Sequence, residues 1–188
     1  MISGNADYSF EGNIGIGKLC DGTTFLFDAD KFDLIKNYKW YLCRKGYKNQ
    51  YVMDCNGTVL HNRLFSVPKG YELDHISMDT LDNRSCNVRI VTHQQNQTNQ
   101  WLQSNNTSGV PGVSYYSPRR KYRARIKING YDLHLGYFNT FKEASQARNV
   151  GVDILFGEYG RKSDTEEAPD YIREKVIQKC APYKNTSL

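Results

Sequence analysis

Residues 71–99 read YELDHISMDTLDNRSCNVRIVTHQQNQTN, and the rest of the chain can be understood from this stretch. An apolar-edged segment leads into Asp74 and His75, and a polar loop rich in Asp, Asn and Ser follows. A β-branched run at residues 88–91 then precedes a segment rich in Gln and Asn. The stretch therefore predicts a strand, a loop, a second strand and a helix, with polar groups at each junction.

The predicted helix places an amide oxygen one turn after its start. Thr92 and Gln95 form a capping-box pair, which predicts that the helix begins near His93. Asn96 offers a neutral oxygen there, and Asp74 offers an anionic one. Two oxygen ligands without a nearby thiolate favour Mg²⁺ or Mn²⁺ over Zn²⁺, with positions left open for water and phosphate oxygens. The alternative is that Asn96 is a solvated helix residue.

His75 is the candidate proton acceptor. Strand neighbours point to opposite faces, so if Asp74 turns toward a metal, His75 must reach a substrate from the other side or from a bend at the strand end. An imidazole with a pKa near its ordinary value of about 6.5 can take a proton from water at neutral pH. The alternative is a hydrogen-bonded histidine at a strand end.

The pattern Asp-His, then Asn-Val-Arg-Ile-Val-Thr, then Gln-Gln-Asn resembles the HNH endonuclease motif, also called the ββα-metal fold. The resemblance implies that His75 is the general base and that Asp74 and Asn96 are the metal ligands. It also implies that Asn87 is a structural residue that ties the loop together and holds the histidine. An ordinary turn residue is the alternative for Asn87.

Two residues beside the motif are candidate DNA contacts. His93 shares a helix face with Asn96 and could touch phosphate or the metal; a plain exposed residue at the helix start is the alternative. Arg63 belongs to the run Leu-His-Asn-Arg-Leu-Phe, which resembles the segment that precedes the motif in many phage HNH proteins. Arg63 could contact a phosphate, or it could form a surface salt bridge.

The first seventy residues predict a small sheet that supports the motif, because thirty residues alone cannot bury enough apolar surface. Asn56 and Gly57 form a two-residue hairpin signal. Trp40, Tyr41 and Phe65 are predicted core residues. The expected strands are residues 23–27, 39–42, 51–55 and 58–60, with a short helix at residues 30–36.

Positive charge is concentrated in one third of the chain. Residues 1–103 are electrically balanced, whereas residues 104–162 hold ten Lys and Arg against four Asp and Glu. This distribution predicts a nucleic-acid-binding module beside a neutral one. The small, polar run QSNNTSG at residues 103–109 is typical of a linker. We therefore place a nuclease domain with its supporting sheet at 1–103, a DNA-binding domain at 104–162 and a tail at 163–188 whose helix covers residues 168–180.

The sequence of the second module predicts three antiparallel strands over residues 110–138 and a covering helix over residues 140–156. Asn129 and Gly130 are a strong type I′ hairpin signal. The second strand alternates Tyr, Ala, Ile and Ile with Arg, Arg and Lys. An apolar helix stripe covers the first set, which leaves a row of cations uncovered. The tail helix could pack on this module or extend along DNA.

This module resembles the AP2 DNA-binding domain over roughly residues 108–158. The matching pieces are Gly-Val-Ser, Tyr-Arg-Ala-Arg-Ile, His-Leu-Gly-Tyr-Phe and Thr-Phe-Lys-Glu-Ala. A β-ribbon is narrow enough to enter the DNA major groove, where Arg can read guanine; phosphate contacts and a solvated charged face are the alternatives. The candidate DNA contacts here are Arg119, Arg120, Lys121, Arg123, Arg125, Lys127 and His134.

The whole chain of 188 residues therefore predicts an α+β, metal-dependent DNA endonuclease that uses one Mg²⁺ or Mn²⁺ ion and binds duplex DNA. It looks like a phage-type, intron-associated or free-standing homing endonuclease. A non-cleaving DNA-binding regulator and an RNA-binding or RNA-cleaving protein are the alternatives. The chain has no long apolar run, no signal-peptide pattern and five cysteines without CxxC spacing. We expect a cytoplasmic monomer of a bacterial or phage-infected cell, with no membrane and no protein partner.

Overall fold

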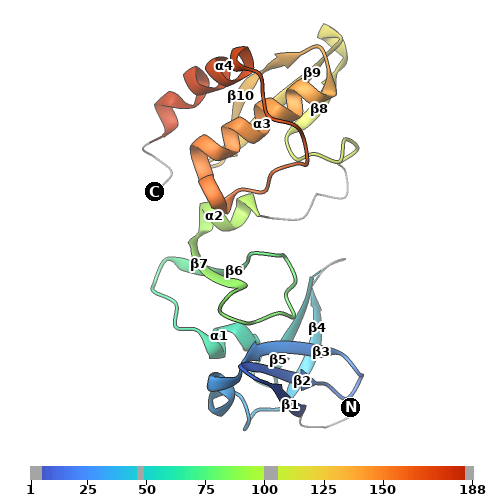
Figure 1. Ribbon diagram of the computed structural model, residues 1–188, viewed down its shortest axis with the longest axis vertical. Helices are drawn as coiled ribbons and strands as arrows, with labels where there is room; N and C mark the ends of the chain where they lie inside the picture. Colours follow the sequence, from blue (N-terminus) through green and yellow to red (C-terminus); the bar gives the residue numbers. More distant parts are fainter. Residues whose placement is uncertain (1–5, 46–48, 100–105, 185–188) are drawn as a thin grey trace. The chain divides into compact units, whose positions relative to one another are not determined.

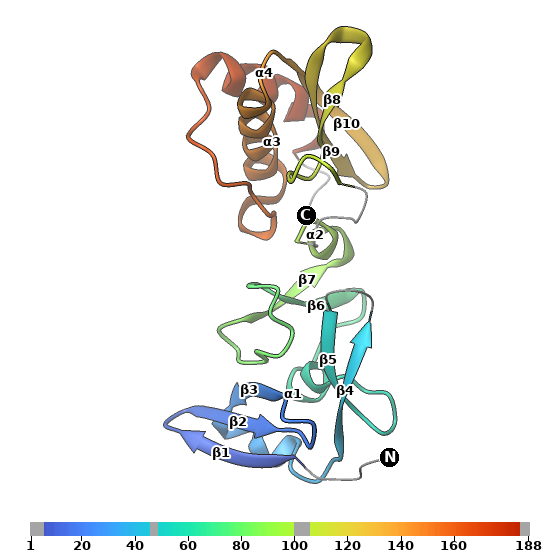
Figure 2. The ribbon, with the colours of Figure 1, turned by 90° about the vertical axis from the view of Figure 1, so that its right-hand side faces the viewer.

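The computed structural model describes residues 6–45, 49–99 and 106–184 (Figures 1 and 2). The described chain is a mixed α+β protein with small antiparallel sheets, which confirms the predicted fold class. It divides into two compact units, Met1–His93 and Gln94–Leu188. The boundary predicted between residues 103 and 104 lies outside the described residues. No described helix combines the length and apolar character needed to cross a membrane.

The described residues of the first unit form short strands, one 3-10 helix and one short α-helix. Strands predicted at residues 23–27 and 39–42 are present, with ends shifted by a few residues. Residues 30–36 largely form the 3-10 helix. The elements are β1 (Asp7–Glu11), β2 (Ile14–Lys18), β3 (Thr24–Asp28), the 3-10 helix η1 (Ala29–Leu34), β4 (Trp40–Lys45), β5 (Asn49–Asp54), α1 (Leu60–Leu64), β6 (Tyr71–His75) and β7 (Val88–Thr92).

The predicted hairpin at Asn56 and Gly57 is only half present. The turn is closed by Asp54, whose backbone N–H donates to the carbonyl of Thr58 at 2.9 Å. The chain then enters α1 at Leu60 instead of continuing as a strand. The partner of β5 is β4, which precedes it in the sequence.

The core of the first unit forms between the β1–β3 sheet, η1, β4 and α1. Trp40 is buried there, as predicted, and its indole N–H donates to the carbonyl of Ile35 at 3.1 Å. Phe65 packs against this core from a partly exposed position. The prediction for Tyr41 is wrong, since it is 38% exposed. Tyr41 follows Trp40 on the same strand and therefore points to the opposite face.

The second unit is a three-stranded sheet covered by two helices (Figure 1). The strand order β8–β9–β10 and the inward direction of Ala124, Ile126 and Ile128 confirm the predicted alternation. The predicted capping box is also present, because Thr140 Oγ1 accepts from Glu143 N at 3.2 Å. The elements are α2 (His93–Thr98), β8 (Val113–Tyr116), β9 (Lys121–Ile128), β10 (Tyr131–Phe138), α3 (Phe141–Phe156) and α4 (Asp170–Cys180).

The tail helix packs on this unit. α4 contacts both α3 and β10, and Ile172, Val176 and Cys180 are fully buried in the same core as the sheet and α3. Their spacing of four residues gives α4 one buried stripe. Of the two placements left open by the sequence, the structure therefore shows the packed one. All five cysteines are free thiols, as expected.

Candidate functional site

The polar loop between β6 and β7 is fixed to the edge of β3. The backbone N–H of Leu26 donates to the carbonyl of Leu81 at 2.9 Å, and the N–H of Asn83 donates back to Leu26 at 2.8 Å. A single parallel bridge joins Leu26 to Asp82 at the same place. The N-terminal sheet thus supports the loop, which is the role predicted for it.

Asn87 ties this loop together from inside. Its Nδ2 donates to the carbonyls of Asp82 at 2.8 Å and Asp79 at 3.2 Å, and its Oδ1 accepts from Ser77 N at 2.9 Å. The residue is buried, so these bonds satisfy polar groups that water does not reach. Asn87 thus holds the backbone of the loop at three points, and its place in a nuclease motif stays a prediction.

His75 is held in one tautomer by a second buried amide. Nδ2 of Asn83 donates to the carbonyl of Leu81 at 3.1 Å, so the amide must turn its oxygen toward the histidine. That oxygen lies 3.2 Å from His75 Nε2 and can only accept, so Nε2 carries the hydrogen. The lone pair of the neutral ring is therefore on Nδ1, and Nδ1 is the atom that can take a proton.

The charge state of His75 suits a base. Burial lowers the pKa of His75 below its ordinary value, against the smaller opposing effects of the Asn83 bond and the carboxylates of Asp74, Asp79 and Asp82. A lowered pKa keeps the ring neutral at pH 7, and the neutral ring is the form that can accept a proton. The residue is only 5% exposed, however, which differs from a histidine standing open at a strand end.

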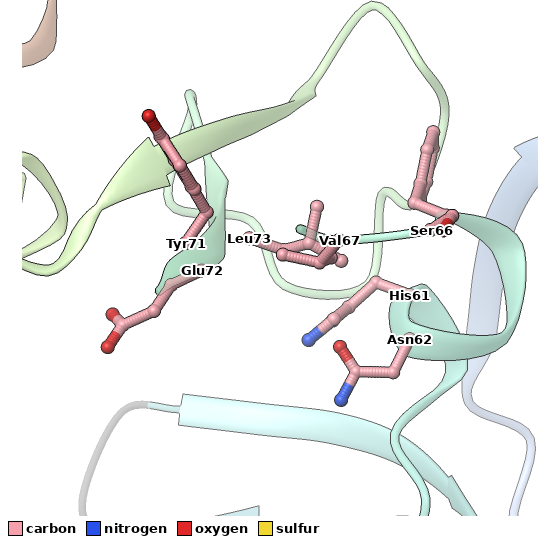
Figure 3. Close-up of a pocket in the computed structure, with 8 residues that line it drawn as sticks. His61, Asn62, Ser66, Val67, Tyr71, Glu72 and Leu73 are labelled. Carbon is pink, nitrogen blue, oxygen red and sulfur yellow. The ribbon is translucent and has the colours of Figure 1, made fainter. Parts of the chain in front are cut away.

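An open pocket is lined by a second histidine, His61 (Figure 3). The ring of His61, on α1, lies 5.1 Å from the ring of His75, centre to centre. His61 also lines a pocket of about 640 Å³ between α1 and β6, together with Asn62, Glu72 and Leu73. His61 thus both lines the pocket and lies beside the buried His75.

Asp74 lies opposite Arg89 in the β6–β7 ladder. Its Oδ2 accepts from Arg89 Nε at 2.9 Å and from Nη2 at 2.8 Å. Both side chains are largely buried, at 7% and 15% exposure. The guanidinium thus balances the charge of a carboxylate that would otherwise be costly to bury.

Asn96 is half-buried on α2, and α2 is anchored within the second unit. Oε1 of Gln94 accepts from Asn129 N at 2.8 Å in the β9–β10 turn. Oγ1 of Thr98 donates to the carbonyl of Tyr159 at 3.0 Å. Asp74 belongs to the first unit, so the structure describes the two candidate ligands each within its own unit.

The donor chemistry of Asp74 and Asn96 fits a hard divalent ion. Mg²⁺ is usually held by one or two carboxylates together with waters and substrate phosphates. Among the described residues, no group of three or more His, Cys, Asp and Glu could form a complete protein cage. One carboxylate and one amide would leave the remaining positions to water and phosphate, and neither ligand is a thiolate that favours Zn²⁺.

Arg63 forms an ion pair in the structure. Its Nη2 lies 2.7 Å from Oδ2 of the buried Asp54, and its guanidinium lies 4.3 Å from the centre of the Tyr38 ring. Burial alone would raise the pKa of Asp54, but hydrogen bonds from Thr58 N, Arg63 and Asn56 N outweigh it and lower the pKa. The salt-bridge alternative is therefore the one observed, with the carboxylate inside the protein.

We expect Asp54→Ala to destabilise the chain by about 2–4 kcal/mol in urea unfolding, because it removes a buried, multiply bonded carboxylate. The folded-state pKa is the lower one, so this stabilisation is complete above the unfolded pKa of about 3.9 and is lost as the pH falls through the folded value. Asp33→Ala removes an exposed pair with Lys36 and should change stability by less than about 0.5 kcal/mol. If both variants lowered the free energy of unfolding equally, Asp54 would not be the stabilising buried carboxylate that we describe.

His93 is exposed at the start of α2. Its Nδ1 lies 2.7 Å from Oε1 of Glu72, and the side chain is 69% accessible. It is therefore a surface residue that pairs across to β6. The exposed ring remains a candidate phosphate contact.

The predicted cationic face of the sheet is present, and aromatic rings lie among its cations. The guanidinium of Arg119 lies 4.6 Å from the ring centre of Tyr137, and that of Arg123 lies 5.3 Å from Tyr116. The Tyr116 and Tyr137 rings are themselves 5.3 Å apart. Stacked guanidinium groups are partly pre-ordered, which lowers the entropy cost of binding.

The other predicted contacts of the sheet are on its surface. Arg125 is half-buried and forms an ion pair with Asp132 at 2.8 Å. The ring of the exposed His134 lies 4.5 Å from that of Tyr137. Arg120, Lys121 and Lys127 are exposed.

Two residues of the site were missed in the sequence. Asn83 stands in a polar loop, where an asparagine usually makes a turn, and only its position eight residues after His75 could have marked it. Arg89 could have been found from the hairpin register, because opposite charges directly across two strands stabilise each other.

Comparison with known proteins finds one family and two relatives. The model of the HNH endonuclease family matches residues 66–98, which span β6, the loop, β7 and α2. An uncharacterized HNH endonuclease of Acanthamoeba polyphaga mimivirus is 32% identical over 152 residues, which cover 78% of this chain and 76% of the relative. Protein 3.8 of Escherichia phage T7 is 33% identical over 64 residues, 34% of this chain and 53% of that protein. No solved structure matches at comparable significance.

Proposed function

The chain belongs to the HNH endonuclease family, and on that premise we propose that it is a metal-dependent DNA endonuclease. The observation that carries the proposal is His75, which lies inside the matched segment and presents Nδ1 as its only proton acceptor. The amide of Asn83 sets that tautomer at 3.2 Å from Nε2. A ring fixed in this way needs no reorientation before it takes a proton.

In the proposed reaction, Nδ1 of His75 takes a proton from water as the water oxygen bonds to phosphorus. The P–O bond to the leaving oxygen breaks, and that oxygen leaves with the electron pair and is then protonated by solvent. Asp74 and Asn96 would hold one Mg²⁺ or Mn²⁺ ion, and Asn87 keeps the loop in shape. A bound divalent ion supplies charge stabilisation to the phosphate oxygens.

The pocket lined by His61 supports this arrangement, because it is a cavity that a phosphate group could enter beside a side chain that neighbours His75. Asp74 would keep Arg89 as its neighbour. The guanidinium is then placed to balance charge at the same carboxylate. Removal of the cation of Arg89 would leave Asp74 buried without its counter-charge.

The second unit would hold the DNA. We propose that its sheet and helix are an AP2-like module that binds duplex DNA through the face carrying Arg119, Arg123 and Arg125. Charge concentration and stacked arginines support this role. DNA cutting and DNA holding in one chain fit a homing-type endonuclease of a phage-infected cell, working as a monomer.

A non-cleaving DNA-binding regulator is the second candidate. Two observations favour it. Asp74 forms an ion pair with Arg89, and His75 is only 5% exposed to solvent. An inactive relative of a nuclease could keep such a site as a purely structural element.

A plasmid-nicking assay separates the two candidates. We expect conversion of supercoiled plasmid to open circle with Mg²⁺ or Mn²⁺, and no conversion after chelation by EDTA. Restoration of cleavage by added Mg²⁺ is the control against damage by the chelator. Duplex binding without any cleavage in either metal would establish the regulator instead.

A further inference from the structure

The tail helix brings two lysines to the sheet that carries the candidate DNA contacts. Nζ of Lys175 lies 4.6 Å from the ring centre of Phe138 on β10. The same ammonium group lies over Gly136, where a side-chain carbon would be only 3.0 Å from Lys175 Nζ. Lys179 follows four residues later and lies on the same helix face. Both side chains are therefore placed beside β10 by the packing of α4.

His134 shows that these lysines and the sheet arginines share one electrostatic environment. Partial burial lowers the pKa of His134, and positive charges of Arg123, Lys179, Lys175 and Arg119 lower it further. Four cations from the β8–β9 turn, β9 and α4 thus lie within reach of one ring. We call Arg119, Arg123, His134, Lys175 and Lys179 the His134 patch.

The two lysines have no compensating acid in the described chain. Other cations of this unit do have one, since Lys142 pairs with Glu166 at 2.7 Å and Lys162 pairs with Asp153 at 2.8 Å. No carboxylate within ion-pair distance of Lys175 or Lys179 is found among the described residues. Uncompensated like charges at one place repel each other, which an anionic partner would relieve.

We propose that α4 is part of the nucleic-acid interface, and that Lys175 and Lys179 bind the phosphate backbone of duplex DNA beside the segment held by the sheet. This inference rests on the proposed function and extends it to a helix outside the AP2-like resemblance. The buried stripe of α4 fixes the helix against the core, so both ammonium groups reach the backbone from a rigid element. Rigid placement lowers the entropy cost of each phosphate contact.

The salt dependence of binding measures this directly. Each phosphate contact contributes about −0.9 to the slope of log K against log salt, which corresponds to roughly five-fold in affinity at 0.15 M salt. We expect the double variant K175Q/K179Q to flatten the slope by about 1.8 and to weaken binding about 30-fold. The readout is fluorescence anisotropy with a labelled random duplex, titrated with the full-length protein at several salt concentrations.

The matched control is K142Q/K162Q, which removes the same two charges from ion-paired, exposed sites of the same unit. It should leave the slope unchanged, and Arg123→Ala should flatten it by about 1 as a reference for the sheet. A wild-type slope for K175Q/K179Q beside a flattened slope for Arg123→Ala would overturn this inference and leave the proposed function standing.

Two other outcomes also count against the inference. Equal losses of duplex affinity in K175Q/K179Q and K142Q/K162Q would show a general effect of net charge. They would exclude α4 from the DNA interface. Absence of duplex binding by the wild-type protein, or stronger binding to single-stranded RNA, would defeat the proposed DNA partner itself.

Discussion

Replacement of His75 by alanine is expected to lower the rate of DNA cleavage by about 10²–10⁴-fold, the usual contribution of a positioned general base. The expected loss corresponds to about 2.7–5.5 kcal/mol in the activation free energy. The reason lies in the geometry, because Asn83 holds Nε2 as a donor and leaves Nδ1 as the acceptor. The measurement is single-turnover nicking of a plasmid in saturating Mg²⁺.

Structural damage must be separated from lost chemistry in this variant, since His75 is buried. Duplex binding by His75→Ala should stay close to wild type, because the second unit that would bind DNA is a separate compact unit. Thermal unfolding is measured beside the rate, because the substitution leaves the buried Oδ1 of Asn83 without its donor and should destabilise the first unit. Added imidazole should recover part of the rate by entering the space left by the side chain. Full cleavage by His75→Ala without imidazole would refute the assignment of the base.

The secondary structure of the motif could be predicted from the sequence because local signals agree there. β-branched residues predict β7, and Thr92 with Gln95 predicts that α2 begins at His93, where the structure places its first residue. The capping box of Thr140 likewise predicted where α3 begins, and the alternation in β9 predicted which of its side chains point inward. In each of these segments the local sequence favours the same secondary structure that the folded protein has.

The N-terminal sheet could not be predicted in the same way. Strand β2 contains Gly15 and Gly17, and glycine ordinarily argues against a strand. In the structure the rings of Phe27 and Phe25 lie directly on these two glycines, in the space that a Cβ would fill. Glycine is therefore required by a cross-strand partner, and that pairing cannot be recognised from the residues of β2 alone.

The bonds of the site depend on partners that are distant in the sequence or on the register of two strands. Asn83 is fixed by the edge of β3, and Arg89 meets Asp74 because of the β6–β7 pairing. Charge counting gave no sign of a DNA contact in the tail helix, since the segment from residue 163 onward is slightly acidic as a whole. The helix itself could be predicted, but only its packing shows that Lys175 lies beside β10.

Replacement of Asn96 by alanine is the second change with a large expected effect. Loss of a residue that merely supports a metal site typically costs about 10–100-fold in metal affinity, and we expect loss of a direct ligand to cost at least as much. The apparent affinity for Mn²⁺, measured by isothermal titration calorimetry in the presence of uncleavable duplex, should fall accordingly. High Mn²⁺ concentrations should then restore part of the cleavage rate, because Asp74 and phosphate oxygens still offer ligands.

Asn96 is a better test of the metal site than Asp74. Removing Asp74 would also break its largely buried ion pair with Arg89, so a loss of activity could come from misfolding. Asn96 is half-buried on a helix that Gln94 and Thr98 anchor independently. Gln97→Ala removes an exposed amide from the same helix and is the matched control. An Asn96→Ala variant that binds Mn²⁺ as tightly as Gln97→Ala would exclude Asn96 as a ligand. Asp74 would then be the one protein ligand left in the proposed metal site.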